Sequence, residues 1–179
     1  MTTAVEVSPA GPEQKALIAG LFQFYVYDFS EFEPAASGDF ELNAETRYDP
    51  YPYLDDYWTD PACIPLLIKW GERVAGFALI NSFFHSGGVL DHSMAEFFVL
   101  RKYRREGVGA RAVAEILARY PGRWEISVLD RNAPAMVFWP RTVSAMPGVS
   151  DLKTIRVDPA QWRGPILQFV AARLRVGGR

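Results

Sequence analysis

A basic, glycine-containing segment, RKYRREGVGA, has the residue types that bind a phosphate group. Arg104 and Arg105 bring positive charge, while Gly107 and Gly109 leave the backbone open to a large ligand. A helical pattern of apolar residues covers 107–119, and the first turn of such a helix offers unpartnered N–H groups at the positive end of the helix dipole. The segment therefore predicts an anion site for a phosphate-bearing ligand.

Two common phosphate motifs do not fit this segment. A P-loop needs a Lys-Ser or Lys-Thr pair after its last glycine, whereas Ala110 and Arg111 follow here. The dinucleotide fingerprint needs a third glycine in a parallel βαβ unit, whereas the preceding chain has the pattern of a hairpin. Neither a P-loop nor a dinucleotide site is therefore predicted.

Glu96 is the residue best suited to acid–base chemistry. It stands in an apolar run, MAEFFVL, which we expect to form the strand that leads into the basic segment. Alternation along a strand would place Glu96 on the same face as Met94 and Phe98, and an apolar setting raises the pKa of a carboxyl group. Two interpretations stay open: Glu96 is a general base, or it makes a structural hydrogen bond or lies at the surface.

The elements around these residues are expected to form one α/β domain over 1–179 with a mixed, largely antiparallel sheet. The expected strands cover 4–9, 63–70, 73–84, 93–101, 123–130, 152–157 and 165–174. The expected helices cover 11–29, 107–119 and 132–142, the last one stopped by Pro140. Between Ser30 and Asp60 the sequence has no clear periodicity, so a loop with one short helix is predicted there.

Charge is divided unevenly along the chain. The net charge is −2, but residues 1–60 hold twelve acidic and two basic residues, a net charge of −10, and the remainder has a net charge of +8. Such segregation favours an anionic ligand on the second part and a cationic ligand on the first.

Composition excludes several classes of protein. Hydrophobic residues make up 49% and charged residues 22% of the chain, as in ordinary globular domains. No apolar run approaches the roughly 20 residues of a membrane span, and the start lacks the pattern of a signal peptide. One cysteine, Cys63, and two histidines, His85 and His92, give no disulfide and no convincing metal site. We expect a cytoplasmic protein without a bound metal, in which Cys63 is a buried apolar residue.

The glycine-containing segment resembles a known family. The run from Arg104 to Gly109 matches the Gln/Arg-x-x-Gly-x-Gly/Ala signature of the GNAT superfamily of acyl-CoA-dependent N-acetyltransferases. The strand before it and the helix after it are similar too, and EFFVLRKYRREGVG looks like the same segment of polyamine acetyltransferases. Downstream, the spacing Asn132-x-x-Ala135-x-x-Phe138-Trp139 resembles the second cofactor motif of the family. The resemblance covers residues 63–175, with 1–60 as a region that shapes the acceptor site.

The resemblance implies a fold, a co-substrate and its contacts. The sheet would splay at its centre, with helices on both faces, and the pantetheine arm of acetyl-CoA would lie in the gap. The residues expected at acetyl-CoA are Phe98, Val99, Leu100, Arg104, Arg105, Gly107, Val108, Gly109, Ala110, Asn132, Ala135, Phe138 and Trp139. The implied activity is direct transfer of an acetyl group to a primary amine of a small cationic acceptor, with Glu96 as the base. A homodimer is expected from similar proteins, and no membrane or nucleic-acid partner.

Trp139 departs from the family pattern. Many relatives place a tyrosine there as the general acid, and an indole N–H does not protonate a thiolate in that way. The proton would then come from another tyrosine, among them Tyr51, Tyr53 and Tyr57, or from water. The same departure leaves an alternative open, a CoA-binding sensor or interaction module that keeps the fold without transfer activity. Nucleic-acid binding through the basic cluster is disfavoured, because residues 1–60 would repel phosphates.

Overall fold

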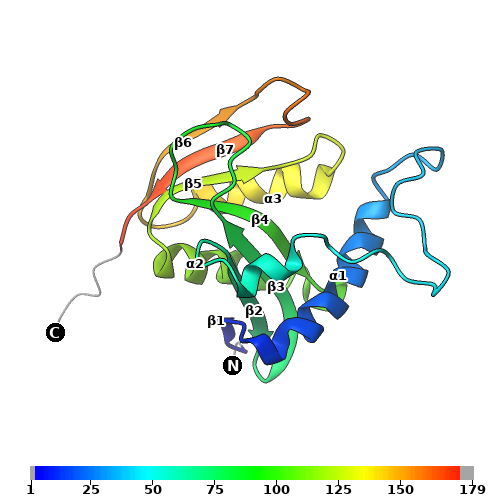
Figure 1. Cartoon of the computed structure of the whole chain (residues 1–179). Coiled ribbons are helices and arrows are strands. Elements are labelled where there is room, and N and C mark those ends of the chain that lie inside the picture. Colours follow the sequence, from blue (N-terminus) through cyan, green and yellow to red (C-terminus); the bar gives the residue numbers. More distant parts are fainter. Residues whose placement is uncertain (1–2, 174–179) are drawn as a thin grey trace.

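A computed structural model describes residues 3–173 of the chain (Figure 1). Its strands are β1 Val5–Pro9, β2 Ile64–Trp70, β3 Arg73–Asn81, β4 His92–Val99, β5 Gly122–Ser127, β6 Val149–Ile155 and β7 Ile166–Ala171. Its helices are α1 Lys15–Ser30, α2 Val108–Arg119 and α3 Ala133–Ser144, with the 3-10 turns η1 Pro12–Gln14, η2 Leu54–Trp58 and η3 Arg101–Tyr103. Every strand and longer helix predicted from the sequence is therefore present, although the last predicted strand residue, Leu174, lies outside the described range.

The strands form one sheet in the order β1-β2-β3-β4-β5-β7-β6. Neighbouring strands are antiparallel except for β4 and β5, which are parallel. The predicted mixed, largely antiparallel sheet is thus confirmed. A tight turn explains the pairing of β2 with β3, because the two strands are joined at Gly71, which has the left-handed φ of 60° that suits a two-residue hairpin.

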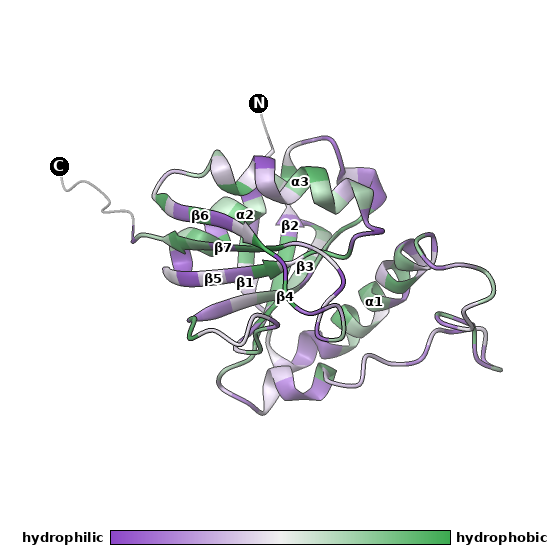
Figure 2. Cartoon of the chain, turned by 90° about the horizontal axis from the view of Figure 1, so that it is seen from above, coloured by the Kyte–Doolittle hydropathy of each residue, from purple (hydrophilic) through white to green (hydrophobic). Residues whose placement is uncertain are grey.

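Helices cover both faces of the sheet, as predicted (Figure 2). On one face α2 buries Val113 and Ile116 and α3 buries Val143, all against strand residues such as Ile80. On the other face α1 and η2 pack over an aromatic layer that includes Phe77. The apolar stripes read from the sequence of the helices therefore form two separate cores, one on each side of the sheet.

Helix α3 continues through Pro140, so the predicted stop at that residue was wrong. Proline removes one backbone hydrogen bond and costs about 3 kcal/mol in a helix interior. Here the last turn of the helix buries Thr142 and Val143. Burial of that turn outweighs the local preference of proline to end the helix. Tertiary packing therefore decides where α3 ends.

The sheet opens at its centre. Strands β4 and β5 pair only at His92 with Trp124 and at Ser93 with Glu125, although both strands continue beyond these residues. The expected splay is therefore present, and it begins directly after Ser93.

A β-bulge in β4 lies next to the point where the strands separate. Leu79 pairs with Glu96 and Ile80 with Met94, so Ala95 has no partner on β3. The extra residue puts Met94 in the core under α2 and α3, whereas Glu96 faces the α1 side together with Phe98. Simple alternation had placed Met94 and Glu96 on one face, and this part of the prediction was wrong because of the bulge.

The segment between α1 and η2 is irregular and extends away from the sheet (Figure 1). It is fastened at Tyr48, whose backbone N–H donates to Gln23 Oε1 at 2.9 Å and whose carbonyl accepts from Gln23 Nε2 at 3.1 Å. The loop with one short helix predicted for 30–60 is thus correct, with η2 as the short helix. No helix among the described residues is long and apolar enough to cross a bilayer.

Candidate active site

A cleft of about 1180 Å³ lies where β4 and β5 separate. Its floor comes from residues 94–97 of β4 and 126–129 at the end of β5, and its walls come from α1, the 38–60 segment and residues 81–85. No lysine or arginine is among the described residues that line it. The cleft therefore combines the splayed sheet with a wall drawn from the acidic first part of the chain.

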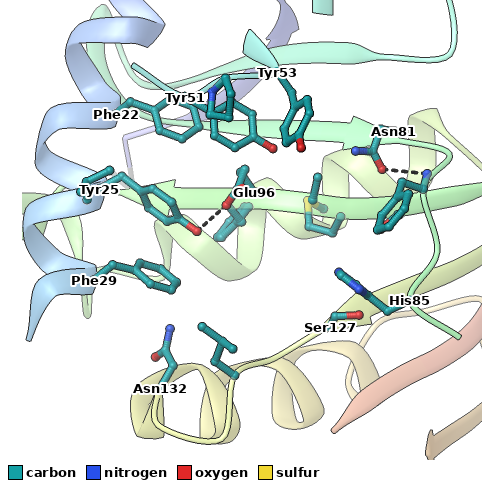
Figure 3. A pocket seen from close by; sticks show the side chains of 18 of the residues that line it. Phe22, Tyr25, Phe29, Tyr51, Tyr53, Asn81, His85, Glu96, Ser127 and Asn132 are labelled. Atoms are coloured by element: carbon teal, nitrogen blue, oxygen red, sulfur yellow. Dashed lines mark hydrogen bonds between the residues drawn. The ribbon is translucent and has the colours of Figure 1, made fainter. Parts of the chain in front are cut away.

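Glu96 stands inside this cleft and is hydrogen-bonded by Tyr25 of α1 (Figure 3). Its side chain keeps some surface open to the cleft but is otherwise enclosed by protein. Burial raises the pKa of Glu96 to about 7, although the hydrogen bonds from Tyr25 and Tyr51 act to lower it. A surface position for Glu96 is thus excluded, and the group is both hydrogen-bonded and able to exchange a proton near neutral pH.

The phenols around Glu96 are held in their protonated form. Burial, followed by the negative charge of Glu96, raises the pKa of Tyr25 and of Tyr51 above the ordinary value. Burial also raises the pKa of Tyr57, whose hydroxyl accepts a hydrogen bond from Asn81 Nδ2 at 3.2 Å. The part of the cleft around Glu96 therefore carries the neutral O–H groups of Tyr25, Tyr51 and Tyr57 beside one titrating carboxyl group.

The edge of β4 that faces the gap offers free backbone groups. The N–H of Leu100 donates to Ala75 of β3 at 2.8 Å, so residues of even number in this part of β4 bond to β3. Phe97 and Val99 consequently turn their backbone groups toward the gap, and the Val99 carbonyl accepts from Arg104 Nε at 2.7 Å. Phe98, Val99 and Leu100 are the strand residues expected at acetyl-CoA, and of these only Val99 turns its backbone toward the gap, while Phe98 and Leu100 bond toward β3.

Helix α2 begins with the geometry expected of an anion site. Gly107 is its N-cap and has φ of 74°, a left-handed conformation that favours glycine. The Gly107 carbonyl accepts the first intrahelical bond, from the N–H of Arg111 at 3.1 Å. The N–H groups of Val108, Gly109 and Ala110 belong to the first turn and have no intrahelical acceptor. These groups can hold an anion at the end of the helix.

The two arginines before this turn are not placed alike. Arg104 forms an ion pair with Asp28 of α1, which also binds Arg101 at 2.7 Å. Arg105 is exposed and has the left-handed φ of 68°. Arg104 therefore ties the loop to α1, and Arg105 is the arginine left open to a ligand beside the start of α2.

The second predicted motif lies along α3. Asn132 is the N-cap, and its side-chain oxygen accepts from the N–H of Ala135 at 3.1 Å. Asn132, Ala135 and Trp139 line the cleft, whereas Phe138 stacks against Phe97 with ring centroids 5.9 Å apart. The ring of Phe138 also covers Gly109, where an added Cβ would lie 3.2 Å from it. Phe138 thus connects the cleft to the first turn of α2.

The structure brings only part of the predicted site into the cleft itself. The predicted residues that line the cleft are Glu96, Asn132, Ala135 and Trp139. The predicted residues outside its lining are Phe98, Val99, Leu100, Arg104, Arg105, Gly107, Val108, Gly109, Ala110 and Phe138. Apart from Phe138 of α3, the second set lies at the end of β4 and the start of α2, and Phe97 and Phe138 connect these parts to the cleft, since Phe138 stacks on Phe97 and covers Gly109.

Comparison with protein families agrees with this geometry. The model of the acetyltransferase (GNAT) family matches residues 26–143, which is more than half of the chain. The chain belongs to the GNAT acetyltransferase family. GNAT enzymes use acetyl-CoA, so the chain is an acetyl-CoA-dependent acyltransferase, as its sequence predicted. No curated protein sequence matches the chain.

Solved GNAT structures share the fold at low sequence identity. An acetyltransferase from Thermus thermophilus superposes with a TM-score of 0.62 at 14% identity, covering 95% of this chain and 98% of that one. The PaiA N-acetyltransferase from Thermoplasma acidophilum, solved in complex with coenzyme A, gives 0.59 at 8% identity, covering 94% and 99%. A GNAT acetyltransferase from Staphylococcus aureus gives 0.57 at 12% identity, covering 92% and 98%. At these identities the likeness concerns the fold alone.

The parts of this GNAT chain fit the chemistry of acetyl-CoA. The free N–H groups at the start of α2 and the exposed Arg105 suit a diphosphate. The outward backbone groups of Phe97 and the outward N–H of Val99, whose carbonyl already accepts from Arg104, suit an amide-bearing arm that runs along the gap toward the cleft. Among the described residues no group of three or more histidine, cysteine and carboxylate side chains could hold a metal ion.

Sequence reasoning missed several residues that line the cleft of this GNAT protein. Tyr25 has the spacing of a helix core residue, and nothing local indicates that its hydroxyl reaches Glu96. His85 and Trp162 come from loops that fold onto the cleft from opposite parts of the chain. Cys63, expected as a buried apolar residue, is half-buried and lines the cleft. The clustering of tyrosines in 48–57 was the one signal of this wall in the sequence.

Proposed function

We propose that the protein transfers the acetyl group of acetyl-CoA directly to a primary amine of a small cationic acceptor, with Glu96 as the general base. The observation that carries the proposal is a carboxyl group with a pKa of about 7 inside a cleft whose described lining has no lysine or arginine. A base with that pKa is half ionised near neutral pH, where proton transfer is most effective.

The charges of the cleft support a cationic acceptor. Its lining contains the carboxyl groups of Asp39, Glu41, Asp49, Asp56, Asp60 and Glu96. Ion pairs neutralise other acids of the same region: Asp28 with Arg104, Glu33 with Arg131, and Asp55 with Lys15. Nine acids of residues 1–60 form no ion pair among the described residues, and five of them, Asp39, Glu41, Asp49, Asp56 and Asp60, line the cleft beside aromatic rings that can hold an ammonium group by cation–π contact.

The transfer follows from these groups. Glu96 takes a proton from the bound ammonium group, and the free amine attacks the thioester carbonyl carbon. The carbon–nitrogen bond forms as the carbon–sulfur bond breaks, and the second proton of the amine nitrogen reaches the departing thiolate sulfur. The cleft phenols are donors for hydrogen bonds, and Trp139 fills the tyrosine position of many relatives without supplying a proton.

The test is a panel of amines assayed with acetyl-CoA and a thiol reagent at low and high salt. A diamine, an aminoglycoside, a free amino acid and a monoamine of similar size would separate cationic acceptors from others. We expect the polycations to be preferred, with a preference that falls as salt screens the carboxylates. Equal rates for the monoamine and the diamine, without a salt effect, would reject the cationic acceptor.

Two neighbouring residues give a matched control. Asp56 lines the cleft, whereas Asp55 forms an ion pair with Lys15 at 2.7 Å and lies outside the cleft lining. Asp56→Asn should raise KM for the diamine several-fold, and Asp55→Asn should leave it unchanged. If both variants change KM equally, the charge of the cleft is not what selects the acceptor.

A further inference from the structure

His85 occupies the end of the cleft opposite Glu96. It lies in the connection between β3 and β4, and its ring stands between Phe83 and Trp162, with centroid distances of 5.1 Å and 4.3 Å. In Figure 3 the ring points into the cleft next to Ser127, across from Tyr25 and Glu96. Two aromatic neighbours thus fix the plane of the imidazole at the wall of the cleft.

A buried carboxylate fixes the backbone of His85. Glu125 is fully buried, and it belongs to the last paired residues before β4 and β5 separate. It accepts from the N–H of His85 at 2.8 Å and from Gln168 Nε2 at 3.3 Å, and it also binds the hydroxyl of Ser86. The connection that carries His85 is therefore anchored to the point where the sheet opens, and a shift of this loop would leave a buried charge without its donors.

The imidazole is suited to accept a hydrogen bond. Burial lowers the pKa of His85 below its ordinary value, against the raising effects of the Glu125 charge and of a hydrogen bond to the Gln161 carbonyl. The ring is thus neutral at and above pH 7. A neutral imidazole has one ring nitrogen with a free lone pair, which can accept a hydrogen bond.

We propose that His85 is a specificity-determining residue whose unprotonated ring nitrogen accepts a hydrogen bond from a second ammonium group of the acceptor, at the end of the cleft opposite Glu96. This inference rests on the proposed function, because it takes the amine at Glu96 to be the reacting one. The cleft has one proton acceptor at Glu96 and another at His85, further carboxylates and aromatic rings in its walls, and no lysine or arginine in its described lining, and this combination fits a diamine or a longer polyamine. A monoamine would fill only one end.

The chain offers its own control for this proposal. Its only other histidine is His92, which packs against Trp124 and Tyr120 and lies outside the cleft lining. Burial lowers the pKa of His92 as well, so both rings are neutral under the same conditions. The full-length protein therefore gives two histidine ring signals in nuclear magnetic resonance, one in the cleft and one away from it.

The experiment titrates the protein with α,ω-diamines and with matched monoamines at about pH 7.5, one unit above the ordinary histidine pKa. The variants His85→Phe and His92→Phe assign the two ring signals and keep a ring at each position. We expect the diamine to move the His85 signal and leave the His92 signal in place. The diamine should bind about tenfold more tightly than the monoamine, the scale of one charge-assisted hydrogen bond. His85→Phe should remove that advantage, and His92→Phe should keep it.

The proposal is overturned if the His85 signal responds equally to diamine and monoamine, or to neither, or if His85→Phe keeps the tenfold difference. The titration contains no acetyl-CoA, so its result is separate from transfer activity. A protein that binds diamines through His85 but acetylates none of them would contradict the proposed function alone. Transfer to amines without a response of His85 would contradict this inference alone.

Discussion

Replacing Glu96 with glutamine should make the protein more stable at alkaline pH. The pKa of Glu96 is raised from the ordinary 4.5 to about 7 by burial. Between these two values the folded protein holds a proton that the unfolded chain has released. The free energy of unfolding therefore falls as pH rises from about 4.5 to about 7, and it stays low above that. Glu96→Gln removes this titration and keeps an oxygen that can accept from Tyr25.

The size of the effect follows from the difference between the two pKa values. At about 1.4 kcal/mol for each pH unit, the loss of stability amounts to about 3 kcal/mol. Part of the Glu96 side chain is open to the cleft, so we expect about 2 kcal/mol in practice. The Gln variant should therefore exceed the wild type by about 2 kcal/mol at pH 8 and equal it near pH 4.5.

Denaturant unfolding at a series of pH values measures this difference. Tyr25→Phe is an informative companion, because the hydrogen bond from Tyr25 lowers the pKa of Glu96. The loss of this hydrogen bond should raise the pKa of Glu96 further, so the free energy of unfolding should keep falling to a higher pH than in the wild type. If Glu96→Gln and the wild type keep the same stability difference from pH 4.5 to pH 8, then the pKa of Glu96 is not raised, and its assignment as the base loses its main support.

Two further substitutions test the anion site and α3. Ala110→Glu should weaken acetyl-CoA binding at least tenfold by calorimetry, because a carboxylate in the first turn of α2 opposes a diphosphate by about 1–3 kcal/mol. A negative charge in the first turn favours the helix itself, and Ala110→Gln is the neutral control. Unchanged affinity of Ala110→Glu for acetyl-CoA would refute the anion site. Ala110 suits this test better than Gly109, where a side chain would press on Phe138. Pro140→Ala should raise the free energy of unfolding by about 1–3 kcal/mol, since it restores a helix hydrogen bond; a denaturant midpoint that falls would contradict this.

The strands and helices were predictable because their apolar patterns are local. The hairpin around Gly71 and the helix that begins after Gly107 each follow from a few neighbouring residues, and the prediction of an anion site at the start of that helix rests on the same residues. Pro140 shows the limit of such local rules, because packing of the following turn overrides the preference of proline. Predictions of a homodimer and of a cytoplasmic location stay predictions.

The cleft was less predictable because it depends on contacts between distant segments. The bulge at Ala95 leaves no mark in the alternation of β4, yet it decides on which side Glu96 lies. Tyr25 reaches Glu96 from a helix seventy-one residues earlier in the chain. His85 is placed by Glu125, forty residues later, through a buried carboxylate that has no local signature. Residue types suggested Glu96 as a base and an acidic region that shapes the acceptor site, but only the fold shows that Glu96 and residues of the 38–60 segment line one cleft.

The most direct test of Glu96 as the general base is the dependence of kcat/KM on pH. It is measured for the wild type and for Glu96→Gln with acetyl-CoA and a diamine. We predict that the wild-type value rises through a pKa near 7, the value of Glu96. The variant should lack this rise and should be about a hundredfold slower at pH 8, the usual scale of general-base catalysis, with little change in acetyl-CoA affinity. A variant within about threefold of the wild type across the whole pH range, against the hundredfold expected of a general base, would contradict the account and leave Glu96 as a structural partner of Tyr25.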